Sequence, residues 1–159
     1  MLLLFSQLVS AAEPAVNSPI LNLCAPPLTR VKPSISHVEA LLGRAKTISY
    51  RDVQNIYDER ITDRLITLDY GQSQVKLFEA PSTGLFILAV ISAREDSNVF
   101  PGSHLVGLRS SELLRIFGKP EVAPNGNYYY PCDEESGASV QFALRDEKVI
   151  EVIWAAGIE

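Results

Sequence analysis

Few side chains in this 159-residue sequence could carry out acid–base chemistry, because it contains only two histidines. His104 lies close to Asp96 and Ser103, and a serine, a histidine and an aspartate can form a nucleophile, a base and an orienting acid. The sequence lacks the Gly-x-Ser-x-Gly turn that exposes such a serine in many hydrolases. His37 falls within a helical pattern, where a surface or packing role is the simpler interpretation. We therefore expect no catalytic residue among them.

The two cysteines, Cys24 and Cys132, favour a disulfide over a reactive thiol. Three acidic residues at 133–135 follow Cys132, and their charges would raise the pKa of its thiol, whereas a nucleophilic cysteine needs a lowered pKa. In an oxidising compartment an even, low cysteine count predicts one disulfide. That bond would close a loop of roughly a hundred residues and stabilise the fold by about 4–5 kcal/mol. The alternative is a lipid-modified Cys24, but Leu23 stands where lipoproteins carry a small residue.

The acidic residues do not form a recognisable metal site. The run at 133–135 and Asp146 could bind Ca²⁺ weakly, yet they lack the alternating spacing of a calcium loop. No zinc-ligand spacing, phosphate-binding glycine loop or dinucleotide fingerprint occurs in the sequence. We therefore expect a protein that is not an enzyme and that uses neither a metal nor a cofactor.

Aromatic residues beside turns are the best candidates for contact with a partner. Three consecutive tyrosines occupy 128–130, and because neighbouring residues of a strand point to opposite faces, their rings cannot all enter one core. Tyrosine offers a large, stiff surface with a hydroxyl group, which suits a binding site. The alternative is that the rings cover the sheet and the disulfide. The candidate partner-binding residues are Asn127, Tyr128, Tyr129, Tyr130, Phe100 and His104.

Charge excludes one class of partner. The net charge is −5 and the 14 basic residues are scattered, with an isoelectric point of about 5.1. Binding to phosphates needs clustered lysine and arginine, so nucleic acid is not an expected partner. A basic protein is the better electrostatic match.

The first twelve residues, MLLLFSQLVSAA, are typical of a secretory signal peptide. An apolar run is followed by small residues, which predicts a signal at 1–12 with cleavage after Ala12. No basic residue precedes the run, and a buried N-terminal helix or strand is the alternative. The run is too short to span a bilayer, and no later segment is long enough to do so. The sequence thus predicts a periplasmic or secreted protein without a membrane span.

Helix and strand patterns follow this segment in a regular order. Prolines spread through 13–33 predict an extended arm without a helix. Residues 34–43 combine a serine N-cap, spaced apolar residues and a closing glycine, which predicts an amphipathic helix. Runs at 64–70, 74–79 and 85–93, separated by turns, predict a three-stranded antiparallel meander. Because the run at 85–93 is apolar throughout, we expect that strand to be covered on both faces.

The same order of elements returns in the second half. Residues 108–120 predict another capped helix, and 128–131, 138–145 and 148–156 predict three more strands, with Trp154 in the core. We interpret this similarity as an internal duplication, with chance similarity between two ordinary stretches as the alternative.

The predicted fold class is α+β, with two tandem helix-plus-meander repeats whose helices pack on one face of an antiparallel sheet. Repeat 1 would occupy 34–93, a connector 94–106 and repeat 2 107–159.

One helix segment resembles a known signature, G-x-S-x-x-E-V-x-x-x-F-G-x-P. The matching residues are Gly107, Ser110 or Ser111, Glu112, Leu113, Phe117, Gly118 and Pro120. A thinner match is formed by Ser36, Val38, Leu42 and Gly43, with Ala45 in place of the proline. This pattern is similar to that of the beta-lactamase inhibitory proteins and of the small outer-membrane lipoproteins that assist barrel assembly. The resemblance implies a helical segment on an antiparallel meander, a unit that the inhibitory proteins carry twice.

Three functions are compatible with these observations. The first is an exported protein-binding module, such as an inhibitor or immunity protein that neutralises a periplasmic or secreted enzyme, for example a basic cell-wall hydrolase. The second is an envelope or outer-membrane assembly factor, which the absence of a convincing lipid-anchor site disfavours. The third is a small Cys/His hydrolase, which depends only on His104 and Cys132. We favour the first.

Overall fold

A computed structural model of the chain describes residues 19–55, 58–101, 104–122, 125–133 and 135–157. The predicted signal peptide at 1–12 and the first part of the predicted arm, 13–18, lie outside these residues. None of the described helices has the length and the apolar run that crossing a bilayer requires.

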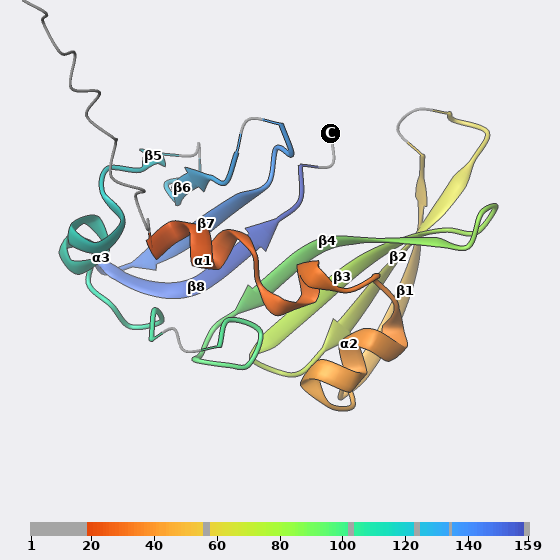
Figure 1. The fold of residues 1–159 in the computed structure, drawn as a ribbon, viewed down its shortest axis with the longest axis horizontal. Helices are drawn as coiled ribbons and strands as arrows, with labels where there is room; N and C mark the ends of the chain where they lie inside the picture. The colour runs from red at the N-terminus through yellow and green to blue at the C-terminus, as the bar shows by residue number, and fades with distance from the viewer. Residues whose placement is uncertain (1–18, 56–57, 102–103, 123–124, 134, 158–159) are drawn as a thin grey trace, which may run out of the picture.

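The described strands form one antiparallel sheet in the order β1-β2-β3-β4-β8-β7-β6-β5. Each half of the chain contributes a helix followed by four strands, and the last strands of the two halves, β4 and β8, lie side by side (Figure 1). With eight strands and only short helices, the fold is mainly β, and the predicted antiparallel sheet is confirmed. The strands are β1 Thr47–Gln54, β2 Thr62–Asp69, β3 Ser73–Ala80, β4 Leu85–Ala93, β5 Glu121–Val122, β6 Tyr128–Pro131, β7 Ser139–Arg145 and β8 Lys148–Ala155.

One face of the sheet, called the inner face here, carries the core. Residues paired across neighbouring strands share a face, and one such row runs from β2 to β7 through both halves of the chain. Its members, Leu68, Val75, Ile91, Trp154 and Val140, are at most 6% exposed. Burying each large side chain stabilises the fold by about 1.5–3 kcal/mol, so this row joins the halves into one core.

The two predicted capped helices are present and pack on the inner face. The first is α2, Ile35–Leu42, where the Ser34 side chain accepts the backbone N–H of His37 and Gly43 ends the helix at a φ of 85°. The second is α3, Ser110–Phe117. Val38 of α2 and Leu113 of α3 are 2% and 0% exposed within the same core. A glycine is favoured at both C-termini because a positive φ costs it little.

The prediction that prolines exclude a helix from the arm is wrong. The described part of the arm forms α1, Pro19–Cys24, and a 3₁₀-helix, η1, Pro27–Arg30. Each begins with a proline, and the first helical position tolerates proline because its N–H would have no partner inside the helix. Leu23 and Leu28, at 7% and 2% exposure, fix both turns to the core.

The predicted strands are present with small changes at their ends, but each half has four strands instead of three. Strands β1 and β5 were not predicted. Strand β1 lies at the edge of the sheet and most of its residues are exposed, so its sequence has little apolar alternation. Strand β5 has two residues, too few for a recognisable pattern.

The expectation that the strand at 85–93 is covered on both faces is also wrong. Leu85 and Ile87 are 53% and 50% exposed, whereas Leu88 and Ile91 are 7% and 0% exposed. The helices pack on one face only, so the other face of β4 stays open despite its apolar sequence.

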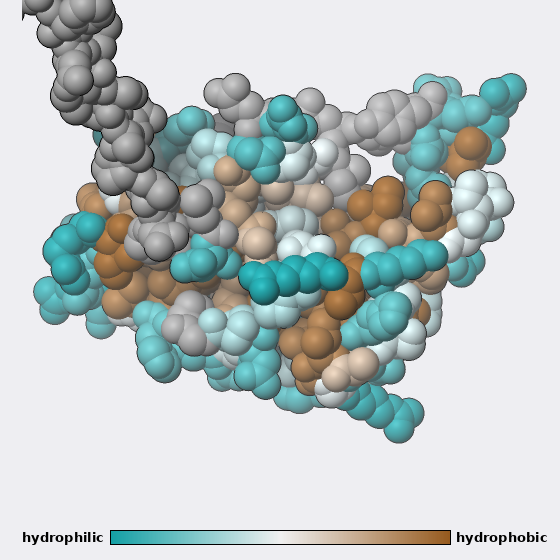
Figure 2. All heavy atoms as spheres, viewed as in Figure 1, coloured by the Kyte–Doolittle hydropathy of each residue, from teal (hydrophilic) through white to brown (hydrophobic). Residues whose placement is uncertain are grey.

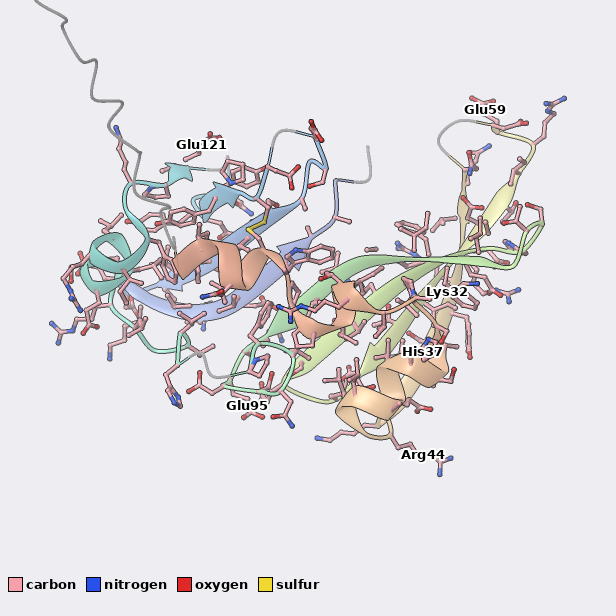
Figure 3. The ribbon with its side chains drawn as sticks, viewed as in Figure 1. Lys32, His37, Arg44, Glu59, Glu95 and Glu121 are labelled. Atoms are coloured by element: carbon pink, nitrogen blue, oxygen red, sulfur yellow. A yellow bond between two sulfur atoms is a disulfide. The ribbon has the colours of Figure 1, made fainter. Side chains whose placement is uncertain are left out.

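The predicted disulfide between Cys24 and Cys132 is confirmed, with the two Cα atoms 5.5 Å apart. It joins the end of α1 to the residue that follows β6 (Figure 3). The Trp154 indole Nε1–H also donates a hydrogen bond of 3.2 Å to the backbone oxygen of Cys24. The arm is therefore attached to both β6 and β8.

Candidate binding surface

The pleat of β6 separates the three tyrosines. Tyr128 and Tyr130 pair with Phe142 and Val140 on the inner face, whereas Tyr129 pairs with Gln141 on the opposite face. Tyr130 is 6% exposed. Only Tyr129 of the three therefore points away from the core.

Tyr130 belongs to an aromatic cluster with Phe117 and Phe142. The ring centroids lie 6.0 Å apart for Tyr130 and Phe117, 5.7 Å for Tyr130 and Phe142, and 5.5 Å for Phe117 and Phe142. The Tyr130 hydroxyl donates a hydrogen bond of 2.9 Å to the Gly118 carbonyl oxygen at the end of α3. Burial, with a smaller contribution from Tyr128, raises the pKa of Tyr130 to about 12. These contacts give Tyr130 a structural role.

The other candidate residues are dispersed. Phe100 is 4% exposed and belongs to the core. Asn127 is half-buried, and its backbone N–H donates a 3.1 Å hydrogen bond to the Asn125 side chain in the turn before β6. His104 is largely exposed, with its Nδ1 2.7 Å from Asp96 Oδ2. Ser103, the third member of the possible triad, lies outside the described residues.

The remaining residues singled out from the sequence have structural partners. Cys132 is bonded to Cys24, so it offers no thiol in this state. His37 is exposed on α2, with its Nδ1 2.7 Å from the Lys32 backbone oxygen. Hydrogen bonds from the Ser136 backbone N–H and hydroxyl lower the pKa of the Asp133 carboxyl. In the described part of the chain, no three His, Cys, Asp or Glu side chains come together as metal ligands.

The face of the sheet opposite the helices, called the outer face here, carries an open row of apolar side chains. Leu65, Phe78 and Ile87 lie directly opposite one another across β2, β3 and β4, with Arg51 at the β1 end of the row. Leu85 lies beside Ile87 on the same face. Figure 2 views the molecule from the side of the helices, where apolar and hydrophilic surface alternate, so the outer face is turned away from the viewer. An apolar row bordered by a charged residue is typical of a protein–protein interface.

Tyr129 extends this open surface into the second half of the sheet. On the outer face, Tyr129, Gln141 and Ile153 form a row across β6, β7 and β8. Glu121 of β5 pairs with Tyr129, so an acidic side chain borders the row at the edge of the sheet (Figure 3). All three row members are half-buried, which leaves part of each side chain available for contact.

A charged cluster on the inner face was not predicted from the sequence. Arg64 lies 3.3 Å from Glu79 and 3.6 Å from Asp52, and its guanidinium carbon is 6.0 Å from the centre of the Tyr50 ring. These residues come from three strands, and their proximity depends on strand register rather than on sequence spacing. The two carboxylates outnumber the single arginine, so the cluster keeps one net negative charge.

The outer face therefore provides a surface on which a partner could bind. It consists of two rows of mainly apolar side chains, and a charged residue borders each row. No family model, curated protein or solved structure matches this chain.

Proposed function

We propose that the chain is an exported, non-catalytic protein-binding module that inhibits a periplasmic or secreted enzyme through its outer face. The observation that carries the proposal is the open row of Leu65, Phe78 and Ile87, together with the row of Tyr129, Gln141 and Ile153. Exposed apolar surface on a sheet is costly to leave in water, and burial against a second protein removes that cost.

Charge and covalent structure support the type and location of the partner. The net charge of −5 attracts a basic enzyme, such as a cell-wall hydrolase, and speeds the encounter. The Cys24–Cys132 bond suits an oxidising compartment, in line with the predicted signal peptide.

The topology supports the proposed duplication and the resemblance to the beta-lactamase inhibitory proteins. Each half consists of one helix followed by four antiparallel strands. In the sheet, the order β1-β2-β3-β4-β8-β7-β6-β5 places the last strands of the two halves next to each other and their first strands at the two edges. Duplicating one unit doubles the width of a continuous sheet surface, which suits recognition of a folded partner.

The test uses the exported form of the chain. A partner is isolated from an envelope extract, purified, and titrated with the chain while its enzymatic activity is followed. We expect a 1:1 complex and loss of the partner's activity. Retention of outer-membrane barrel proteins instead would favour the assembly-factor alternative, and turnover of a substrate that requires His104 would favour a hydrolase.

We expect Tyr129→Ala to weaken the complex by more than about 1 kcal/mol, roughly fivefold in Kd, if the ring anchors the interface. The matched control is Leu114→Ala on α3, which removes a side chain of 38% exposure from the helical side. Equal affinity for the Tyr129→Ala variant and the unchanged chain would exclude this part of the outer face.

A further inference from the structure

A polar pocket of about 370 Å³ lies at one end of the first half of the sheet. It is bounded by Leu42 at the end of α2, by Tyr70 just after β2 and Ser73 at the start of β3, and by residues 95–99 after β4. Figure 3 shows Glu95 in this last loop, on the lower side of the view. The pocket is separate from the outer-face rows.

Hydroxyl groups without partners surround this pocket. Among the described residues, three buried side-chain oxygens have no hydrogen-bond partner, and two of them, Tyr70 Oη and Ser97 Oγ, belong to residues that line it. Ser73 also lines it and is only 6% exposed, so its side chain adds a further polar group to the wall. An unsatisfied buried hydroxyl costs about 1–3 kcal/mol, so a ligand that bonds to both of these hydroxyls would remove that cost.

The charges around the pocket determine the sign of that ligand. Glu95 and Asp96 line it, and Asp96 is paired with His104 at 2.7 Å. Burial, and then the nearby charge of Glu39, raise the pKa of the Tyr70 hydroxyl. Lys46 extends over Gly71 on the adjoining turn and does not line the pocket. The C-terminal end of α2 adds the negative end of a helix dipole, so the surroundings favour a cation.

We propose that this pocket binds a primary ammonium group, presented by a lysine side chain of the protein partner. An ammonium group has three N–H donors and no acceptor, which matches hydroxyl oxygens and carboxylates that can accept. It is also a compact charge on a flexible apolar stem, which suits a pocket with Leu42 on its wall. The proposal rests on the proposed function only for the source of the lysine, because the pocket itself can be tested with a small molecule.

The test is an NMR titration of the isotope-labelled chain with Nα-acetyl-lysine methylamide. We expect saturable, millimolar binding that shifts the amide signals of 70–73 and 95–99. The norleucine analogue has the same stem without the ammonium group and should produce no saturable shift. Equal shifts with both compounds, or none with the lysine compound, would overturn the proposal. That result would leave the Tyr129→Ala test of the outer face unaffected.

Two variants separate binding from folding. Tyr70→Phe and Ser97→Ala each remove a hydroxyl without a protein partner, so the free energy of unfolding should stay the same or rise. Binding of the lysine compound should weaken by about fivefold in each, the equivalent of one hydrogen bond. Ser111→Ala, at an exposed position of α3, is the matched control and should bind normally. Unchanged binding in both variants would contradict the role of the hydroxyl groups.

The source of the ammonium group is tested with spermidine, a free amine. If a lysine side chain is the natural occupant, spermidine should bind more tightly than the lysine compound only through its additional positive charges. That difference in affinity should disappear in high salt, which screens those charges. Spermidine binding that is much tighter at high salt would identify a free polyamine as the ligand and overturn the lysine assignment.

Discussion

Tyr129 and Tyr130 are neighbours in the chain but have different physical roles. Tyr130 packs edge-on against Phe117 and Phe142 and donates to the Gly118 carbonyl, so its hydroxyl anchors the end of α3 to the sheet. Tyr129 lies on the other side of the pleat with part of its ring in solvent. The same side-chain chemistry thus serves stability at one position and is available for recognition at the next.

Removing the Tyr130 hydroxyl should weaken the fold. In Tyr130→Phe the Gly118 carbonyl loses its donor while the aromatic packing is kept, so we expect the free energy of unfolding to fall by about 1 kcal/mol. Urea denaturation followed by circular dichroism measures the change. Tyr129→Phe is the control, because no hydrogen bond from its hydroxyl is found in the described residues. Equal stability of both variants would show that the Gly118 contact contributes nothing.

Alkaline pH should destabilise the protein through the same residue. The pKa of Tyr130 is raised to about 12 in the folded state, compared with 10.0 for an ordinary tyrosine. The folded state therefore holds this proton more tightly than the unfolded state, and its contribution is complete below pH 10 and is lost as the pH rises toward 12. The free energy of unfolding should fall over this interval, with a smaller slope in Tyr130→Phe. An identical slope would contradict the assignment to Tyr130.

At this scale the sequence predicted the disulfide but not the hydroxyl pocket. Two cysteines leave one intramolecular pairing, so the bond between Cys24 and Cys132 could be predicted from the sequence. Tyr70 follows β2 and Ser97 follows β4, and whether their hydroxyl groups have partners depends on tertiary packing. No spacing in the sequence carries that information.

Among the elements, strand β4 shows that its place in the sheet, and not its apolar composition, decides which of its side chains are buried. Nearly all of its residues are apolar, yet they alternate between the core and the outer face on both sides of the bulge near Leu88, and the most exposed, Leu85 and Ile87, precede it. Because the helices pack on the inner face only, composition alone could not show that the outer face lacks a cover.

Truncating a side chain to alanine should destabilise the protein more on the inner face of the first half than on its outer face. Leu77 of β3 is 0% exposed on the inner face, so Leu77→Ala should reduce the free energy of unfolding by about 2–5 kcal/mol. Ile87 of β4 is 50% exposed on the outer face, and Ile87→Ala should cost less than about 1 kcal/mol. Chemical denaturation of the two variants measures both effects. A large loss in Ile87→Ala would show that the outer face is covered in solution.

Elements with strong local signals were predictable and those fixed by neighbours were not. Serine and glycine caps identified α2, and alternation between turns identified the strands on either side of the β4–β8 pair. Strand β1 pairs along its whole length with β2, although its own residues are mostly exposed, so its partner decides its conformation. Helix α1 is short and begins with a proline, and tertiary contacts of Leu23 stabilise it more than its own propensity does.

For the whole molecule, the disulfide acts between segments that are remote in the chain. Its two cysteines are separated by 108 residues, so the bond removes much of the conformational entropy of the unfolded state. By contrast, β4 and β8 meet over only four residue pairs, Val90 with Ala155 to Ala93 with Val152. The covalent link therefore holds the arm, which leads into α2 of the first half, on the second half of a molecule whose halves share only a short strand junction.

Breaking the disulfide should cost about 4–5 kcal/mol, a large part of the 5–15 kcal/mol that stabilises a typical domain. The double variant Cys24→Ala and Cys132→Ala avoids free thiols, and its urea midpoint should fall well below that of the oxidised chain. The reduced unchanged chain should behave in the same way. A loss below about 1 kcal/mol would mean that the unfolded chain is already compact around this link.

The hydrogen bond from Trp154 to the backbone of Cys24 makes the arm optically observable. Trp154 is the sole tryptophan of the chain, and it is 6% exposed beneath the segment that the disulfide holds. Release of that segment would bring water to the indole and move its emission to longer wavelengths. Intrinsic fluorescence of the unlabelled protein should therefore report detachment of the arm as a local event, before circular dichroism registers any loss of the sheet.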